Sequence, residues 1–159
     1  PAPENFRDLC RSLGAALGLS GTEQSNTDPE SGAVVLVGTS YHRLGLIAEG
    51  DEQACYHDFA ASLAMEGRKI WWKPHPRARH AEQWLGDRGV NVVASCLPLE
   101  VQFAHQLNAS STCASIGSSA LLMAPIYFGS RPVLLGERFL PCLSKRLPHV
   151  ALIRKALAS

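Results

Sequence analysis

The chain has 159 residues, of which 46% are hydrophobic and 18% are charged, a composition typical of one globular domain with a real core. Its formal net charge of +1 argues against a general nucleic-acid-binding protein, because binding to a phosphate backbone normally requires a strong excess of basic residues. Five cysteines at irregular spacing, with no CxxC pair, favour neither a disulfide framework nor a zinc site. They indicate a reducing, cytoplasmic location.

The first part of the chain predicts a helix followed by a linker. Apolar residues at helical spacing in 3–20 precede the polar stretch GTEQSNTDPESG, so we take 1–32 as an N-terminal helix and linker and 33–159 as the folded domain. The chain begins at Pro1 with no signal-like segment, and its apolar runs are shorter than the about 20 residues that a membrane-spanning helix needs. We therefore expect it to be part of a longer protein whose partner domain is absent from this sequence.

From residue 33 onward, predicted strands alternate with predicted helices. This order, with nearly continuous apolar strands, is typical of a mainly parallel sheet covered on both faces, and it predicts an open, doubly wound, Rossmann-like α/β domain. In such sheets ligands bind beyond the carboxyl ends of the strands, so the loops TSYHRLG, KPHPRAR and IGSSA should share one rim. The predicted strands are 33–38, 68–73, 90–95, 110–116 and 131–136, and the predicted helices are 52–66, 77–89, 97–107, 117–129 and 149–158.

The loop KPHPR follows the second predicted strand. Pro74 and Pro76 flank His75, and they restrict the backbone and reduce the entropy lost in positioning the imidazole. Histidine can donate a hydrogen bond to a phosphate and can protonate a leaving group, and Lys73 and Arg77 would add positive charge around it. The loop therefore predicts an anion-binding site, with an exposed basic turn as the alternative.

The loop IGSSA lies where the fourth predicted strand turns into a helix. The first N–H groups of a helix have no partner within the helix and carry the positive end of its dipole, so they bind anions well. Ser118 and Ser119 would add hydroxyl donors, and Gly117 would allow close approach. The alternative is that one serine only caps the helix. The sequence has no GxSxG motif, so nothing indicates a hydrolase nucleophile.

The stretch LPLE places Glu100 on the same predicted rim. Its carboxylate could accept hydrogen bonds from ribose hydroxyls, as acidic residues do in dinucleotide-binding folds. A glutamate that only complements the dipole of a helix is the alternative. Trp71 and Trp72 alternate along the second predicted strand, and we expect core packing for both rather than base stacking.

Two other charged stretches have simpler explanations than binding. Glu49, Asp51 and Glu52 could suggest a metal site, but a solvated loop and a helix cap account for them, and the chain has no Walker loop, GxGxxG or HExxH motif. The C-terminal HVALIRKALAS is apolar with two cations, so it either touches a membrane surface or packs back on the domain. We expect packing.

In order and spacing, KPHPR, LPLE and SIGSSALL resemble the carboxyl-terminal half of bacterial sialyltransferases, and most closely the capsular α-2,8-polysialyltransferase-like group and its lipooligosaccharide sialyltransferase relatives. The resemblance covers about residues 33–136 and implies one half of a glycosyltransferase-B arrangement of two Rossmann-like domains. It implies that His75 binds the donor phosphate and assists departure of CMP. Ser118 and Ser119 would bind the same phosphate, and Glu100 would bind the ribose of the cytidine. The other residues that we assign to the donor site are Lys73, Pro76, Arg77 and Gly117.

The same resemblance implies a function and partners. The chain would be the CMP-sialic acid-binding domain of an inverting sialyltransferase that makes capsule or lipooligosaccharide. It would bind a nucleotide-sugar donor, reach a glycan acceptor through a missing N-terminal domain, and need neither a metal nor another cofactor. No nucleic acid would be bound, and peripheral contact with the inner face of the cytoplasmic membrane stays open.

One departure from the family pattern concerns the catalytic base. The stretch AEGDE does not reproduce the family's acidic motif, which supplies the base that activates the acceptor hydroxyl. We expect that base in the absent domain, so this chain alone would be an incomplete catalyst. Two alternatives remain: a non-catalytic nucleotide-binding or interaction module of the same fold, and the donor domain of a CDP-glycerol-type glycerophosphotransferase, which shares the His-Pro loop and the paired serines.

Overall fold

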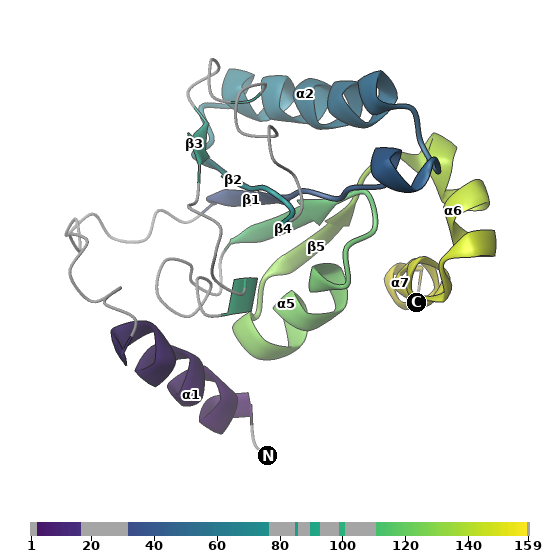
Figure 1. Ribbon diagram of the computed structural model, residues 1–159. Helices are drawn as coiled ribbons and strands as arrows, with labels where there is room; N and C mark the ends of the chain where they lie inside the picture. Colours follow the sequence, from purple (N-terminus) through teal and green to yellow (C-terminus); the bar gives the residue numbers. More distant parts are fainter. Residues whose placement is uncertain are drawn as a thin grey trace.

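The computed structural model describes residues 3–16, 32–76, 85, 90–92, 99–100 and 111–158 (Figure 1). These residues form one parallel sheet with helices on both of its faces. The α-helices are α1 (Pro3–Ala16), α2 (Glu49–Met65), α5 (Ala120–Phe128), α6 (Leu140–Arg146) and α7 (Pro148–Leu157), and the 3₁₀ helices are η2 (His42–Leu44) and η3 (Glu137–Phe139). The strands are β1 (Val34–Val37), β2 (Ile70–Lys73), β3 (Asn91–Val92), β4 (Thr112–Ser115) and β5 (Arg131–Leu134).

The five strands lie in the order β3-β2-β1-β4-β5, and every neighbouring pair is parallel. In the register of the sheet, Val35 on the central strand β1 is opposite Trp71 on β2 and Cys113 on β4. After β1 the chain builds one side of the sheet, and after β3 it crosses to build the other. The reversal between β1 and β4 is a topological switch point, where doubly wound folds bind ligands. The predicted Rossmann-like α/β fold is therefore confirmed.

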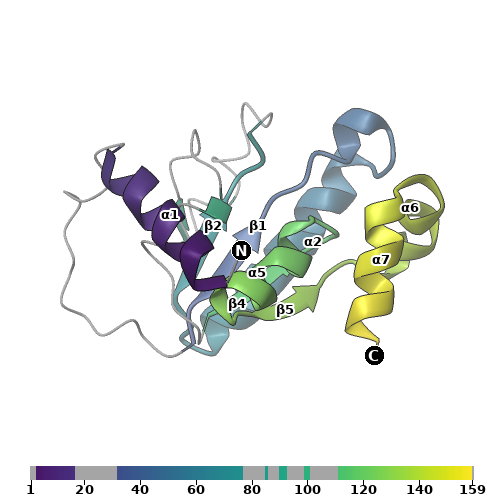
Figure 2. The same cartoon turned by 90° about the horizontal axis from the view of Figure 1, so that it is seen from below.

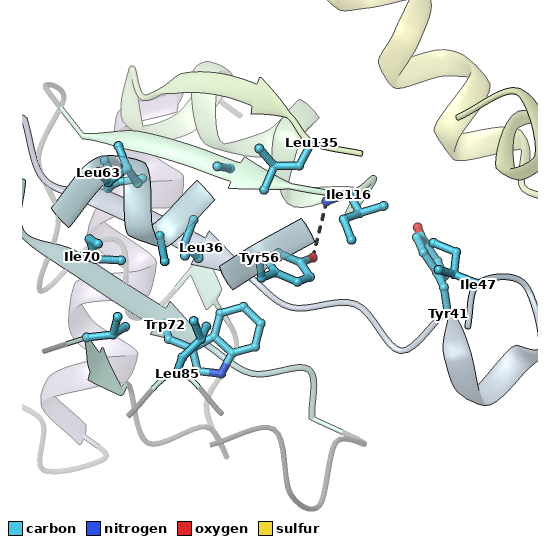
Figure 3. Packing of buried hydrophobic residues seen from close by; sticks show 14 of the residues in the cluster. Leu36, Tyr41, Ile47, Tyr56, Leu63, Ile70, Trp72, Leu85, Ile116 and Leu135 are labelled. Atoms are coloured by element: carbon cyan, nitrogen blue, oxygen red, sulfur yellow. Dashed lines mark hydrogen bonds between the residues drawn. The ribbon is translucent and has the colours of Figure 1, made fainter. Parts of the chain in front are cut away.

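Strand β1 is buried on both faces because each face of the sheet is covered by a helix. In Figure 1, α2 lies on one side of the strands and α5 on the other, and Figure 2 shows α5 from below in front of the sheet. Val34 and Leu36 pack into the core on the α2 side, whereas Val35 and Val37 pack into the core on the α5 side. Figure 3 shows part of the first cluster, in which Tyr56 lies close to Trp72 and Leu36.

Most of the predicted elements that fall on described residues agree with the structure. Four predicted strands match β1, β2, β4 and β5 to within a few residues. Trp72 is buried in the core and Trp71 packs half-buried against the cluster on the α5 side, as expected. Most of the predicted helices 77–89 and 97–107, with the end of the predicted strand 90–95, lie outside the described residues.

Three features go beyond the sequence expectations or differ from them. Residues 91–92 of β3 are exposed, because this strand forms an edge of the sheet. Helix α2 begins three residues earlier than predicted, and this places Glu52 in its first turn, facing inward. Helix α6 was not predicted because 140–146 shows no clear apolar period, yet Leu140 and Leu143 are buried there.

The two terminal helices pack on the sheet layers. Helix α1 contacts α5 through Phe6 and Tyr127, whose ring centroids are 4.3 Å apart. The predicted linker that follows α1 lies outside the described residues. Helix α7 buries Val150 and Ile153, so the expectation that it packs back on the domain is confirmed. None of the helices in the described part of the chain is long and apolar enough to span a bilayer.

Candidate functional site

A cleft of about 330 Å³ opens at the switch point of the sheet. Its residues come from the ends of β1 and β2, the start of α5 and the short segment 99–100. A volume near 300 Å³ is at the lower end of the range for small-molecule sites, which is about 300–1,000 Å³. The lining residues are Val37, Gly38, Lys73, Pro74, His75, Pro76, Leu99, Glu100, Ser118, Ser119 and Ala120.

The cleft brings together most of the residues that the sequence singled out. Six of the eight predicted donor-site residues line it, namely Lys73, His75, Pro76, Glu100, Ser118 and Ser119. Gly117 precedes the two serines but does not line the cleft, and Arg77 lies outside the described residues. Residues as far apart in the sequence as Lys73 and Ser119 therefore meet at one place.

The His-Pro loop leaves β2 in a fixed path. Lys73, the last residue of β2, is only 3% exposed, and Pro74 is buried after it, whereas His75 is half-buried and Pro76 exposed. The backbone N–H of Gly38 donates to the Lys73 carbonyl at 2.8 Å, which continues the pairing of β1 with β2 into the loop. His75 is thus held at the surface of the cleft by a buried segment.

Gly38 is required for this close approach. A Cβ atom at this position would lie 2.8 Å from the ring of Trp72 and 3.1 Å from the backbone nitrogen of His75. Trp72 is fully buried and cannot swing away. The absence of a side chain at residue 38 therefore sets where His75 leaves the strand.

The paired serines have different roles in the turn before α5. The Ser118 hydroxyl accepts a hydrogen bond from the Ala120 N–H at 3.3 Å, so Ser118 caps the helix, which is the alternative role expected for one of the two serines. In the described part of the chain, neither the N–H nor the hydroxyl of the exposed Ser119 has a hydrogen-bond partner. Ser119 therefore presents a backbone donor and a hydroxyl at the positive end of a helix dipole.

The turn itself rests on groups that the sequence analysis did not identify. The Ser115 hydroxyl accepts from the Ser118 N–H at 3.2 Å, and the Tyr41 hydroxyl donates to the Gly117 carbonyl at 2.9 Å. Gly117 has φ +146°, and a Cβ there would lie 3.1 Å from Val150. Burial, with a smaller effect of the Glu52 carboxylate, raises the pKa of Tyr41 to about 12, so this hydroxyl remains a donor at neutral pH.

Glu100 enters the cleft from the segment 99–100, near Cys10 of α1. It is half-buried. Burial raises the pKa of the Cys10 thiol, and the nearby Glu100 carboxylate adds to that rise. A carboxylate here can accept hydrogen bonds from the hydroxyls of a ligand, and the cations and donors of the other two loops can bind an anion.

Glu52 was expected in a solvated loop or cap, and this expectation is wrong. The side chain is 2% exposed, and it accepts from the Thr39 hydroxyl at 2.5 Å, the His42 N–H at 2.8 Å and the His42 Nδ1 at 2.7 Å. Tyr41 adds a backbone N–H at 3.3 Å. A buried carboxylate is costly unless donors surround it, so Glu52 fixes the loop after β1 rather than facing solvent. Its neighbours Glu49 and Asp51 are exposed, as expected.

The family model for alpha-2,8-polysialyltransferase matches residues 9–137 of the 159-residue chain. The chain belongs to this family. Membership in the alpha-2,8-polysialyltransferase family makes the chain a glycosyltransferase, and it implies glycosyl transfer of the sialyltransferase type between a nucleotide-sugar donor and a glycan acceptor. Comparisons with curated proteins and with solved structures gave no match.

The matched part of this polysialyltransferase-family chain contains the whole cleft. It begins within α1 and ends in η3, so all five strands and every cleft residue fall inside it. Within the described residues, no group of three or more His, Cys, Asp or Glu side chains could hold a metal ion. The polar groups that face the cleft are those of the His-Pro loop, Glu100 and the two serines.

Proposed function

We propose that this chain is the donor-binding part of an inverting sialyltransferase that uses CMP-sialic acid to build a cell-surface glycan such as a capsule or lipooligosaccharide. The observation that carries the proposal is the meeting of His75, Glu100 and the paired serines in one cleft at the switch point. Family membership supports a sialyl donor.

The cleft suggests how CMP-sialic acid would bind. The phosphate would lie at the start of α5, where the Ser119 N–H and the hydroxyls of Ser118 and Ser119 can donate to its oxygens. The side chain of His75 would donate to the same phosphate from the opposite loop. Glu100 would accept from the ribose hydroxyls, which places the cytidine toward the segment 99–100.

The reaction would be a direct displacement at the anomeric carbon of the sugar. An oxygen of the acceptor glycan forms the new bond to that carbon while the bond to the phosphate oxygen breaks, and the electron pair leaves with CMP. His75 and the two serines stabilise the charge that develops on the departing phosphate. A base outside this cleft takes the acceptor proton, and the mechanism assigns no part to a metal. We place the reaction in the cytoplasm, where acceptor glycans at the inner membrane face would be within reach.

Calorimetric titration of the chain with CMP tests this proposal. We expect binding of CMP in the micromolar to millimolar range and a loss of about tenfold in affinity for His75→Ala, which is about 1.4 kcal/mol for a hydrogen bond to a charged group. His57→Ala is the matched control, because His57 is also a half-buried histidine but lies on α2. This variant should bind CMP like the unchanged chain.

Two outcomes would contradict the proposal. If CMP does not bind, or if His75→Ala binds it with unchanged affinity, the donor-site assignment fails. Tighter binding of CDP than of CMP would instead favour a CDP-glycerol-type donor. A full-length product that binds CMP but transfers no sialic acid would make the chain a binding module.

A further inference from the structure

A buried pair of hydroxyl groups lies directly behind the cleft and belongs to neither of its loops. Ser115, the last residue of β4, is fully buried. Its hydroxyl accepts from the N–H of Ser118 at 3.2 Å and from the N–H of Gly117 at 3.5 Å. These two bonds hold the turn in place, and among the amides of residues 117–119 they leave the Ser119 N–H without a partner in the described part of the chain.

Tyr56 brings the second hydroxyl from α2, on the far side of the sheet. Its phenol donates to the Val37 carbonyl at 2.8 Å and accepts from the Ile116 N–H at 3.4 Å, and it lies 3.4 Å from the Ser115 hydroxyl. Figure 3 shows the phenol oxygen directed at the Ile116 nitrogen. One side chain thus joins the end of β1 to the end of β4, and Val37 and Ser118 both line the cleft.

Packing alone does not explain why residue 56 carries a hydroxyl group. The Tyr56 ring packs edge-on against Trp72 at a centroid distance of 5.0 Å, and a phenylalanine would make the same contact. A buried hydroxyl without partners is costly, whereas here four polar groups lie within 3.4 Å of it, the fourth being the Thr39 hydroxyl. Burial raises the pKa of Tyr56, so the phenol keeps its proton and can donate to Val37.

We propose that Tyr56 and Ser115 are positioning residues for phosphate binding: their hydroxyl groups hold the turn 117–119 at a fixed separation from the end of β1, so that the Ser119 N–H and the serine hydroxyls face a ligand phosphate. This inference rests on the proposed function, because it concerns the phosphate of the nucleotide donor. Neither residue touches the ligand. Both act through the main chain of the turn.

The test separates the phosphate from the rest of the nucleotide. CMP and cytidine are each titrated into the unchanged chain, Tyr56→Phe and Ser115→Ala. Dissociation constants are taken from changes in NMR chemical shifts, a method that can measure values in the millimolar range. We expect each variant to bind CMP about tenfold more weakly, the equivalent of one or two hydrogen bonds, and cytidine within about twofold of the unchanged chain. A general loosening of the fold would weaken both ligands alike.

Two control variants match the changes. Tyr127→Phe removes the hydroxyl of a half-buried tyrosine at the end of α5, and Ser62→Ala removes a hydroxyl that donates to the Phe59 carbonyl within α2. Both should bind CMP and cytidine like the unchanged chain. If Tyr56→Phe fails to fold in a thermal melt, Ser115→Ala decides, since it removes one small group and leaves the core aromatic rings in place.

The outcomes distinguish this inference from the proposed function. An unchanged chain that binds neither CMP nor cytidine refutes the proposed function itself. An unchanged chain that binds CMP, with variants that bind it equally well or lose CMP and cytidine in parallel, overturns the positioning role alone. Selective loss of CMP binding in each variant that folds supports it.

Discussion

The two loops that face each other across the cleft are held in place by different physical means. The His-Pro loop is fixed by sterics, since two prolines flank His75, Pro74 is buried, and Gly38 approaches within contact distance of Trp72 and His75. The serine turn 117–119 contains no proline and is fixed by hydrogen bonds to its main chain. The first loop should therefore respond to changes in volume, and the second to the loss of single hydroxyl groups.

This difference has a consequence for what each loop can do. A loop fixed by packing keeps its geometry whether or not a ligand is present, which suits a side chain that must aim at one atom. In a turn fixed by hydrogen bonds, acceptors of the protein and acceptors of a ligand compete for the same N–H groups. In the turn, the Ser115 hydroxyl accepts from the Gly117 and Ser118 amides but not from that of Ser119, so the network determines which of the three amides is left for a ligand.

The largest effect is expected from filling the contact beneath the His-Pro loop. In Gly38→Ala the new methyl group would meet the buried Trp72 ring at 2.8 Å and the His75 nitrogen at 3.1 Å. We expect the free energy of unfolding to fall by about 3 kcal/mol, and CMP affinity to fall with it, because the loop must shift. Urea denaturation measures the first quantity and calorimetry the second.

Gly50→Ala is the control for this substitution. Gly50 lies in α2, and a Cβ atom added there would meet no other atom within 4 Å. Alanine also favours helix over glycine by about 0.5–1 kcal/mol, so this variant should be slightly more stable than the unchanged chain. If Gly38→Ala is as stable as the unchanged chain, the close approach does not fix the loop.

Alkaline pH should weaken the hydrogen bonds that hold the serine turn. The pKa of Tyr41 rises from 10.0 to about 12 in the folded protein, mainly through burial and secondly through Glu52. Because the folded protein holds this proton more tightly than the unfolded chain, the contribution of Tyr41 is fully present below pH 10 and is lost as the pH rises toward 12. At about 1.4 kcal/mol for each pH unit, the loss amounts to about 2–3 kcal/mol.

Urea denaturation from pH 8 to pH 12 measures this loss. Tyr41→Phe should reduce the fall in stability above pH 10 without removing it, since burial also raises the pKa of Tyr56. Tyr127→Phe, which leaves the turn intact, should show the same fall as the unchanged chain. An equal slope in Tyr41→Phe and Tyr127→Phe would show that Tyr41 does not hold its proton as described.

The backbone of the turn provides a third comparison. Gly117→Ala must adopt a φ of +146°, which side chains rarely adopt, and its Cβ would lie 3.1 Å from Val150 and 3.3 Å from the Tyr41 hydroxyl. We expect a loss of about 2 kcal/mol in the free energy of unfolding. Gly45→Ala, at φ +64° and with open space around it, should lose only about 1 kcal/mol. Equal losses would mean that the packing against Tyr41 and Val150 adds nothing.

The sequence revealed one of these two loops better than the other. The prolines and cations beside His75 are neighbours along the chain, so their pattern could be recognised, and the rule that parallel strands end on one rim correctly brought His75, Glu100 and Ser118 to the same cleft. The supports of the serine turn could not be found in this way. Tyr56 on α2 and Ser115 on β4 are 59 residues apart in sequence and meet only because α2 packs against the sheet.

Glu52 shows why burial is hard to infer from composition. It stands beside Asp51 in a stretch that reads as solvated, yet the helical rotation from one residue of α2 to the next directs it inward, toward Thr39 and His42. The donors that compensate its charge include two main-chain N–H groups, which leave no trace in the sequence. The direction of such a side chain depends on its position in the helical period. Because α2 starts three residues before the predicted helix, the inward direction of Glu52 was not predicted.

The smallest effect on stability is expected from substituting the paired serines themselves. Comparing the two substitutions distinguishes a serine that caps the helix from one that only binds a ligand. Ser118→Ala removes the hydroxyl that accepts from Ala120, so we expect a loss of about 1 kcal/mol in stability together with weaker CMP binding. Ser119→Ala removes a hydroxyl with no partner in the described part of the chain, so stability should change by less than about 0.5 kcal/mol while CMP affinity still falls. Thermal melts and CMP titration of the two variants measure both quantities. Equal stability losses would mean that both serines cap α5, and the turn would then have only the Ser119 amide for a phosphate.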